Sequence, residues 1–449
     1  MLTFSEVLER GARGDEGDFY ARLDALDASE VAQMIYTSGT TGAPKAVMLS
    51  HHNICWTAAQ LLTCAEVKED DVVLSYLPLS HIAEQLTSIY GPVCAGAQLY
   101  FARSFDKLPE DLKEVRPTVF VGVPRVWEKF KAKAESGIAE QPALRQRLVK
   151  WARGVALRFH EEQFAHKQSS LTLQAEYAAA RRVVFAPLKA RIGLDRARIL
   201  ITSAAPISRE VLEFFASVDM PICEIYGQSE VTGPTSVSVP DAMKLGKLGR
   251  PMPGVEVRID DDGEILVRGG NVCLGYFKNP EATAELLQDG WLHSGDVGRF
   301  DEDGFLEITG RKKEIIVTSG GKKTSPANIE GLLRNIEPLG PTLVIGERRK
   351  YLVALLTIDP DRVAKFAKAH QLPSNPQELV NDAGFRAYLR DAIEKEVNPR
   401  LSRFESIKQF EVLPGEFTIA GGELTSTLKL RRKVVEQKYA AQIEKLYAE

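Results

Sequence analysis

Several absences narrow the class of protein before any motif is considered. The sequence has no Cys-x-x-Cys pair, and its five cysteines are widely spaced, which argues against a zinc ribbon or a disulfide framework and favours reduced thiols in a cytosolic setting. No uninterrupted apolar run reaches the roughly 18 residues of a membrane span. Residues 1–19 are acidic and lack the apolar centre of a signal peptide. With 57 basic and 61 acidic residues, the composition does not favour nucleic acid as a partner.

The 449 residues are 44% hydrophobic and 26% charged, which is enough for two large domains or three smaller ones, each with a buried core. In the first two thirds, strand-like segments alternate with helical ones, and this alternation predicts an α/β fold with a largely parallel sheet. The predicted strands are Val31–Tyr36, Asp71–Leu77, Ala97–Ala102, Thr118–Val123, Ala197–Thr202 and Pro221–Tyr226.

A long helical region is predicted between Arg125 and Arg196. Helical spacing places a set of apolar residues on one stripe, and these are Leu144, Leu148, Trp151, Val155 and Phe159. Arg147, Lys150 and Arg158 lie on another face. We interpret that face as a solvated charged surface, with contact to a membrane surface as the alternative.

After Tyr226, the alternation of strand-like and helical segments gives way to a β-rich pattern. Val255–Asp260 and Gly263–Arg268 predict a hairpin within a β-rich subdomain, and a second turn follows at Asp301–Gly304. Beyond a short polar connector, residues 314–449 predict a separate mixed α+β domain. The chain is therefore expected to comprise an N-terminal domain (1–310), a hinge (311–313) and a small, mobile C-terminal domain (314–449).

The most informative segment is a loop rich in glycine and hydroxyl groups, directly after the first predicted strand. Its candidate ligand-binding residues are Thr37, Ser38, Gly39, Thr40, Thr41, Gly42 and Lys45. Glycines allow close backbone approach, hydroxyls donate hydrogen bonds and the lysine adds positive charge, a combination that suits a polyphosphate. It is not a Walker A loop, because Pro44 precedes the lysine and Ala46 follows it. The alternative is a Ser/Thr/Gly surface loop.

The run YTSGTTGAPKAVMLSH resembles the phosphate loop of the adenylate-forming superfamily, which includes acyl-CoA synthetases, luciferases and peptide-synthetase adenylation domains. Further blocks occur in the family's order, and the resemblance extends to the C-terminus. It implies an α/β fold: a large N-terminal domain of parallel-rich sheets with helices and a β-rich subdomain, then a small mobile α+β domain. Its first subdomain is expected to be incomplete, because members usually carry a large segment before this loop.

In this resemblance, His81 of PLSHIAE lines the acyl-binding face, although a lone histidine more often serves packing. The loop TSAAPIS places Ala204, Ala205 and Pro206 beside the adenine, or is simply a strand end followed by a helix cap at Ser208. The adenine-side block YGQSEVTG supplies Tyr226, Gly227 and Gln228. Glu230 in the same block is implied as the Mg²⁺ ligand, since hard cations on phosphates favour carboxylates.

The later blocks concern the ribose, the hinge and catalysis. Asp296 of WLHSGD and Arg311 are implied as ribose contacts, and Lys313 as the hinge residue. Gly320 and Gly321 are implied to flank the pantetheine channel. Lys429, in GGELTSTLKLRR, corresponds to the family's catalytic lysine; from charge alone, this segment would be the start of a basic helix.

The resemblance implies ATP, Mg²⁺ and CoA as cofactors and substrates. VPRVWEK, GERRKYL and the Gly421–Lys429 segment are similar to long-chain fatty acyl-CoA synthetases, the bubblegum-type branch above all. The expected reaction is ATP-dependent formation of a fatty acyl-AMP and acyl transfer to CoA, with Thr37, His81, Glu230 and Lys429 as catalytic residues. We expect a cytoplasmic protein without a nucleic-acid partner, and peripheral contact with a membrane is compatible with this expectation.

Three alternatives remain at this point. The chain is a shortened homologue that binds nucleotide or acyl groups without turnover; or it adenylates an acid for a carrier-protein acceptor; or, least favoured, it is a kinase or P-loop ATPase. The sequence leaves the acyl chain length and the oligomeric state open.

Overall fold

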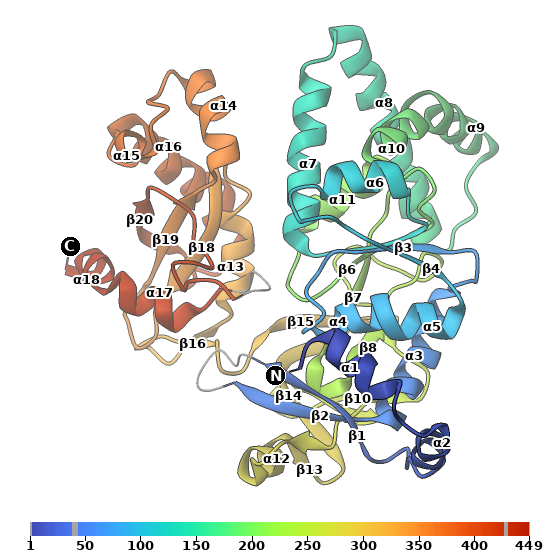
Figure 1. Cartoon of the computed structure of the whole chain (residues 1–449). Coiled ribbons are helices and arrows are strands. Elements are labelled where there is room, and N and C mark those ends of the chain that lie inside the picture. Colours follow the sequence, from blue (N-terminus) through green and yellow to red (C-terminus); the bar gives the residue numbers. More distant parts are fainter. Residues whose placement is uncertain (1, 38–43, 426–429, 449) are drawn as a thin grey trace.

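The computed structural model describes residues 2–37, 44–425 and 430–448. Figure 1 shows a larger body formed by the first two thirds of the chain and a smaller one formed by the last third. The strands of the described residues are β1 (Val31–Thr37), β2 (Lys45–Ser50), β3 (Val72–Ser75), β4 (Gln98–Phe101), β5 (Val119–Gly122), β6 (Ile199–Thr202), β7 (Cys223–Gln228), β8 (Gly233–Val237), β9 (Arg250–Pro251), β10 (Val255–Ile259), β11 (Glu264–Gly269), β12 (Gly275–Tyr276), β13 (Leu287–Gln288), β14 (Trp291–Phe300), β15 (Leu306–Arg311), β16 (Ile316–Val317), β17 (Lys323–Thr324), β18 (Leu339–Ile345), β19 (Leu352–Ile358) and β20 (Ile407–Leu413). The α-helices are α1 (Phe4–Gly11), α2 (Glu16–Asp24), α3 (His51–Ala65), α4 (Ile82–Gln85), α5 (Gly91–Ala95), α6 (Leu108–Val115), α7 (Pro124–Ala139), α8 (Ala143–Phe164), α9 (Leu171–Ala180), α10 (Ala186–Ile192), α11 (Arg209–Ser217), α12 (Pro280–Leu286), α13 (Pro326–Leu333), α14 (Pro360–His370), α15 (Pro376–Leu379), α16 (Ala383–Ala392), α17 (Arg432–Lys438) and α18 (Ala440–Ala448). Short turns of other helix types are η1 (Leu86–Tyr90), η2 (Arg181–Phe185), η3 (Ser229–Val231), η4 (Ile393–Val397) and η5 (Asn398–Arg400).

The central sheet of the large domain has the strand order β4-β3-β5-β6-β7-β8-β9. Strands β4, β3, β5, β6 and β7 pair in parallel, so the predicted parallel sheet is confirmed for this part of the chain. Strands β8 and β9 extend it antiparallel. One face packs against the helices between β5 and β7 through a core that includes Phe120, Trp127 and Phe215, all fully buried. Loops that follow the parallel strands therefore share one edge, where ligands of such sheets bind.

The first predicted strand does not belong to the parallel sheet. β1 pairs antiparallel with β2, from Val31–Ser50 to Thr37–Lys45, and β12 completes this three-stranded sheet. The reason is the length of the connection, because Thr37 and Lys45 are too close in sequence for the crossover of a dozen or more residues that a parallel pair needs. The sequence analysis also missed β2 as a strand.

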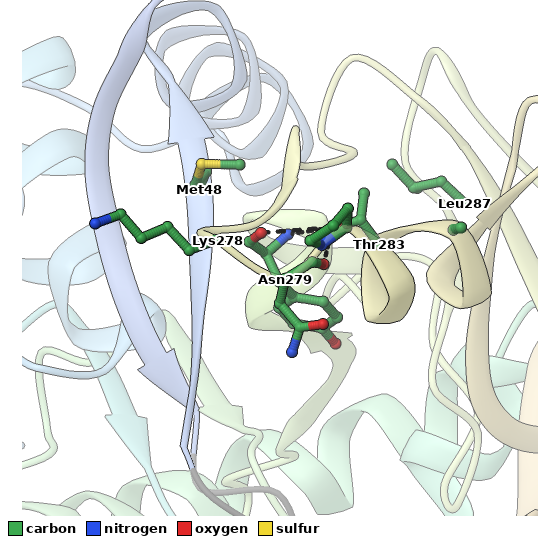
Figure 2. Close-up of a pocket in the computed structure, with 8 residues that line it drawn as sticks. Met48, Lys278, Asn279, Thr283 and Leu287 are labelled. Carbon is green, nitrogen blue, oxygen red and sulfur yellow. Dashed lines mark hydrogen bonds between the residues drawn. The ribbon is translucent and has the colours of Figure 1, made fainter.

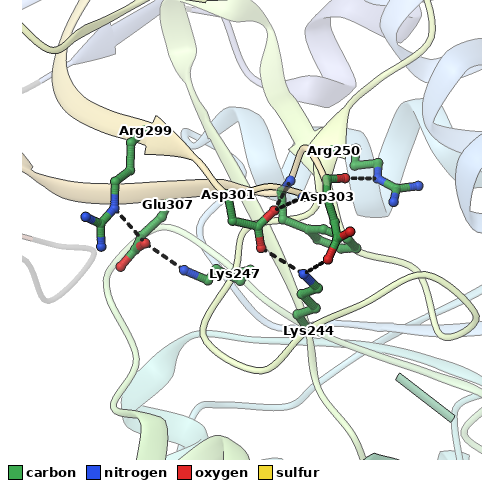
Figure 3. Close-up of polar contacts among 8 residues, drawn as sticks. Lys244, Lys247, Arg250, Arg299, Asp301, Asp303 and Glu307 are labelled. Carbon is green, nitrogen blue, oxygen red and sulfur yellow. Dashed lines mark hydrogen bonds and ion pairs between the residues drawn. The ribbon is translucent and has the colours of Figure 1, made fainter. Parts of the chain in front are cut away.

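The β-rich subdomain follows the prediction more closely. β10 and β11 form the expected hairpin, and β11, β14, β13 and β15 complete a five-stranded sheet. Ion pairs fix the β14–β15 hairpin to the loop after β8: Lys244 Nζ lies 3.0 Å from Asp301 Oδ2, and Lys247 Nζ lies 2.6 Å from Glu307 Oε2 (Figure 3). Arg299 also contacts Glu307. The loop after β8 therefore holds the hairpin at two points, its turn and β15.

The long helical region forms as predicted, as α7 to α10, but its apolar stripe is only half buried. Val155 on α8 is fully buried, and one turn later Phe159 stacks on Tyr177 of α9 with ring centroids 3.8 Å apart. Toward the start of α8, Leu144 is 79% exposed and Trp151 is 41% exposed. The stripe therefore continues beyond the part that α9 covers.

The small domain is built on the sheet β18-β19-β20, in which β18 and β19 are antiparallel and β19 and β20 are parallel. Every residue of β19 is buried, as expected for a central strand with helices on both faces. Two ion pairs reach the large domain: Arg125 contacts Glu416, and Arg400 Nη1 lies 4.0 Å from Glu210 Oε1. Within the described residues, the search for a helix long and apolar enough to cross a membrane found none.

Candidate active site

The phosphate-loop candidate connects two adjacent antiparallel strands. Thr37 is the last residue of β1 and faces Lys45, the first of β2, and the Thr37 hydroxyl donates to the Lys45 carbonyl at 3.4 Å. Ser38, Gly39, Thr40, Thr41 and Gly42 lie outside the described residues, so their predicted roles stay predictions. The two strands fix the points at which the chain leaves and re-enters the sheet.

A tyrosine links the end of this hairpin to the predicted metal ligand. Lys45 Nζ lies 4.7 Å from the centre of the Tyr276 ring, and the Tyr276 hydroxyl donates to Glu230 Oε1 at 2.9 Å. Burial and the Glu230 charge raise the pKa of Tyr276 far above its usual value, so the phenol stays protonated and remains a donor. Tyr276 holds the carboxylate in one orientation. No sequence pattern singled it out; β12 spans only Gly275–Tyr276.

The donor set around Glu230 fits Mg²⁺ held largely by phosphate. Among the described residues, no group of three or more His, Cys, Asp or Glu side chains could enclose a metal ion. Mg²⁺ usually retains water and binds one or two carboxylates plus substrate phosphates rather than a full protein cage. Glu230 is half-buried and uses one oxygen for Tyr276, so its second oxygen suits this arrangement.

Three predicted nucleotide contacts meet around Asp296. This aspartate lies on β14 opposite Arg311 of β15, and Arg311 Nε is 2.9 Å from Asp296 Oδ1. The Tyr226 hydroxyl donates to Asp296 Oδ2 at 2.9 Å. Asp296 and Tyr226 are 3% and 6% exposed. Burial and the Asp296 charge raise the pKa of Tyr226 well above its usual value, so its proton stays on the oxygen.

The Asp296 and Glu230 clusters act on the same guanidinium. Burial acts to lower the pKa of Arg311, but the charges of Asp296 and Glu314 outweigh it, with smaller contributions from Tyr226 and Glu230, and raise that pKa. Tyr226 lies in β7 and Glu230 lies in the turn after that strand, four residues later, which explains the proximity. The structure thus brings together the predicted metal ligand and both predicted ribose contacts.

A buried carboxylate that the sequence analysis missed contacts the residues next to Asp296 and Arg311. Glu264 of β11 is 4% exposed and accepts a hydrogen bond from the Gly295 N–H at 2.8 Å. His293 Nδ1 lies 3.1 Å away, and Lys312 Nζ lies 2.7 Å away. Although burial opposes ionisation, the contacts with Lys312, His293 and Gly295 lower the pKa of Glu264. Glu264 therefore ties the turn before Asp296 to the residue after Arg311. Its position two residues after Asp262 in a hairpin turn gave no signal of burial.

A backbone constraint explains one of the small residues predicted near the adenine, Gly227. A Cβ on Gly227 would lie 1.6 Å from the Gly233 carbonyl oxygen, so only glycine fits where β7 meets β8. Ala204 has φ +75°, a left-handed conformation that favours glycine. Ala204 is the second residue of the loop after β6, and the exposed Ala205 and Pro206 follow it. Ser208 caps α11, accepting from the Val211 N–H at 3.3 Å. Gln228 ends β7, half-buried. Adenine contact for these residues stays a prediction.

His81 has a structural task in addition to any contact with substrate. It is the N-cap of α4, and its Nδ1 accepts from the Ala83 N–H at 3.2 Å. An accepting Nδ1 places the proton of the neutral ring on Nε2. The packing interpretation and the site interpretation are therefore compatible, and the acyl-side role stays a prediction.

The hinge candidates lie where the chain leaves the large domain. The Lys312 N–H donates to the Gly295 carbonyl at 2.8 Å, and its side chain contacts Glu264 and Asp262. Lys313 is the next residue and is exposed. Gly320 and Gly321 form the exposed tip between β16 and β17, with φ +73° at Gly321.

Lys429 lies outside the described residues, but both ends of its segment are held. Leu424 and Leu430 form a bridge, and the Arg431 N–H donates to the Glu423 carbonyl at 2.7 Å. Arg432 follows; its side chain is buried with Nη1 2.7 Å from Glu330 Oε1 and donates to the Val344 carbonyl at 2.6 Å.

A shallow hollow of about 510 Å³ lies beside Tyr276 (Figure 2). Met48 of β2 and Leu287 of β13 lie at its two sides, with Asn279 and Thr283 of the α12 region between them. The Asn279 side chain caps α12, and Thr283 accepts from the Tyr276 N–H at 2.9 Å. These contacts hold the backbone of the tyrosine that orients Glu230.

Comparison with known proteins agrees with this geometry. Residues 4–277 match the family described as AMP-binding enzyme, and residues 313–449 match the AMP-binding enzyme C-terminal domain. The chain belongs to the AMP-binding enzyme family. It is 39% identical over 444 residues to a putative fatty-acid–CoA ligase, fadD11, of Mycobacterium tuberculosis, covering 98% of this chain and 78% of that protein. It is 37% identical over 481 residues to the long-chain-fatty-acid–CoA ligase ACSBG2 of Gallus gallus, covering 100% of this chain and 62% of that protein.

Solved structures share the family fold. An ATP-bound chimera, RpMatB-BxBclM B1, superposes with a TM-score of 0.66 at 22% identity, over 92% of this chain and 69% of that chain. The O-succinylbenzoate coenzyme A synthetase MenE of Bacillus subtilis, in complex with ATP and magnesium ion, superposes with a TM-score of 0.62 at 21% identity, over 91% and 70%. The predicted fold class, a large N-terminal domain followed by a small α+β domain, is thereby confirmed.

Proposed function

We propose that this chain is an AMP-forming fatty acid–CoA ligase. It binds ATP and Mg²⁺, converts a long-chain fatty acid to acyl-AMP with release of pyrophosphate, and transfers the acyl group to CoA with release of AMP. Two relatives named as fatty-acid–CoA ligases match 98% or more of this chain, which supports the substrate class. We further propose a cytoplasmic protein that contacts membranes peripherally.

One observation carries this proposal. The Glu230–Tyr276–Lys45 contacts and the Tyr226–Asp296–Arg311 contacts lie on neighbouring elements of one domain, and both influence Arg311. The first set suits a metal-bound polyphosphate, and the second offers a carboxylate and a guanidinium to ribose hydroxyls. Together they match the two ends of one nucleoside triphosphate.

The chemistry needs positioning and charge neutralisation rather than a protein nucleophile. A carboxylate is a poor acyl donor because oxide cannot leave, whereas attack of the acid on the α-phosphate converts it to an acyl-adenylate with AMP as the leaving group. In this proposal Thr37, Lys45 and the loop between them hold the phosphates, and Glu230 holds Mg²⁺, which neutralises phosphate charge. Asp296 and Arg311 hold the ribose.

The small domain supplies the residues for each half-reaction. Lys429 bridges the carboxylate and the α-phosphate during adenylation, a type of contact whose loss typically costs roughly 3–4 kcal/mol of barrier. Rotation about Lys313, directly after the anchored Lys312, withdraws Lys429 and presents Gly320 and Gly321 to the thiol arm of CoA. His81 lines the acyl side.

ATP–pyrophosphate exchange with the purified chain tests the proposal. We expect exchange that depends on both palmitate and Mg²⁺, and palmitoyl-CoA when CoA is added. Exchange without thioester would favour a carrier-protein acceptor. Nucleotide binding without exchange would identify a non-catalytic homologue and contradict the proposal.

A further inference from the structure

The first two turns of α8 present an uncovered apolar face. Leu144, Leu148 and Trp151 are spaced by four and three residues, so they lie on one side of the helix. They are 79%, 39% and 41% exposed. Farther along the same stripe, Val155 is buried and Phe159 is half-buried against Tyr177 of α9. In Figure 1, α7 and α8 project from the large domain at the end opposite β1 and β2.

The charged side chains on this part of α8 have a single sign. Residues 141–160 contain Arg145, Arg147, Lys150, Arg153 and Arg158 and no aspartate or glutamate. Two of these have partners within the protein: Arg158 Nη2 lies 3.0 Å from Glu176 Oε2, and Arg153 donates to the Ser217 hydroxyl at 2.8 Å.

The remaining three basic residues surround the apolar face. By helical position, Arg145 lies on one side of it, and Arg147 and Lys150 lie on the other. Within the part of the chain that the structure describes, no carboxylate lies within ion-pair distance of these three side chains; Arg145 contacts only the neutral Gln141 side chain. Their charges are therefore available to an external partner.

We propose that this face docks the protein on an anionic phospholipid surface. Leucine and tryptophan between lysine and arginine form an interfacial helix, whose apolar residues enter the headgroup layer while the basic residues contact lipid phosphates. Protein interfaces, by contrast, have cores depleted of charged residues, lysine among them. This inference locates the membrane contact proposed above. It rests on the proposed function in one respect: a fatty acid–CoA ligase docked on a membrane gains access to an acid dissolved in the bilayer.

Vesicle flotation with the full chain, without ATP or acyl substrate, tests this proposal. The probes are vesicles of phosphatidylcholine alone and vesicles of equal parts phosphatidylcholine and phosphatidylglycerol. The wild-type chain should float with the anionic vesicles, and salt should weaken the binding. Because each basic residue near such a surface contributes about 1 kcal/mol, R147Q/K150Q should weaken binding on the order of thirtyfold. The double variant K368Q/K408Q removes the same charge from exposed sites on the small domain and should bind like wild type.

A second pair of variants tests the contribution of the apolar side chains to vesicle binding. Leu144→Ser should weaken binding, whereas Leu171→Ser, at an 83% exposed position on α9, should not. Trp151 emission should shift to the blue on anionic vesicles, and W151F should lose that shift.

Equal flotation of R147Q/K150Q and K368Q/K408Q would overturn the proposal. So would a change of oligomeric state in Leu144→Ser with unchanged vesicle binding, which would make this face a protein interface. Pyrophosphate exchange measured without vesicles reports on the proposed function separately, because none of these variants touches the candidate active site.

Discussion

Replacing Glu264 by glutamine tests whether a buried negative charge stabilises the segments that carry Asp296 and Arg311. The carboxylate contacts Lys312 Nζ at 2.7 Å, the Gly295 N–H at 2.8 Å and His293 Nδ1 at 3.1 Å. Glutamine keeps an acceptor for Gly295 but loses the charge. Lys312 is 44% exposed and retains Asp262 at 2.6 Å, so only part of the interaction is lost. Hydrogen bonds to charged groups contribute about 1.5–3 kcal/mol, and we expect a loss of about 2 kcal/mol in the free energy of unfolding.

The pH dependence has a definite sign. The pKa of Glu264 is lowered from its ordinary value of 4.5, because its contacts outweigh the effect of burial. Its contribution to stability is therefore present above about pH 4.5 and is lost as the pH falls through the folded-state pKa. The stability difference between wild type and Glu264→Gln should be full at pH 7 and should narrow in acid.

Urea unfolding followed by tryptophan fluorescence provides the assay, with Glu256→Gln as the control. Glu256 lies on the neighbouring strand β10, its side chain is 61% exposed, and it pairs with Arg268. Such exposed pairs contribute roughly 0–1 kcal/mol. Glu264→Gln should also raise the KM for ATP about tenfold by loosening the turn before Asp296. Equal effects of the two substitutions on stability and on KM would refute the reasoning.

Two further substitutions test the site's geometry. Tyr276→Phe removes the hydroxyl that orients Glu230. It should therefore cost about 1–2 kcal/mol of stability and raise the Mg²⁺ concentration needed for half-maximal pyrophosphate exchange. The control, Tyr351→Phe, loses a hydrogen bond to the Leu446 carbonyl at 3.0 Å in the small domain and should leave the Mg²⁺ requirement unchanged. Gly227→Ala should destabilise the fold by roughly 3 kcal/mol or more in urea unfolding, because its Cβ would meet the Gly233 carbonyl. Gly137→Ala, in open space on α7, should leave stability unchanged or raise it, and a mild effect at Gly227 would contradict the described packing.

The sequence predicted the parallel strands and the β10–β11 hairpin well, because both depend on local patterns. It did not predict that β1 would pair with β2. That outcome follows from the length of the connection, which outweighs the strand–helix alternation farther along the chain. It also did not predict where the α8 stripe is covered, because Phe159 stacks on Tyr177 of α9, and the helical period does not reveal how α9 docks.

The candidate site shows the same division. Asp296, Arg311 and Glu230 stood out through their motifs, and the structure places them close together. Tyr276 and Glu264 did not, although both contact site residues directly or through one backbone group. Their roles depend on contacts between residues 29 to 48 positions apart in the sequence, which neither spacing nor composition records.

The central claim is that one ATP is shared by two domains, with Lys429 acting in only the first half-reaction. Lys429→Ala should be assayed for pyrophosphate release from ATP and palmitate, and for palmitoyl-CoA formation from supplied palmitoyl-AMP. Loss of one preorganised charge contact typically costs ~10²–10³ in rate, so pyrophosphate release should fall by about that factor while thioester formation from the adenylate stays near wild type. An equal fall in both half-reactions, or none in the first, would contradict the account.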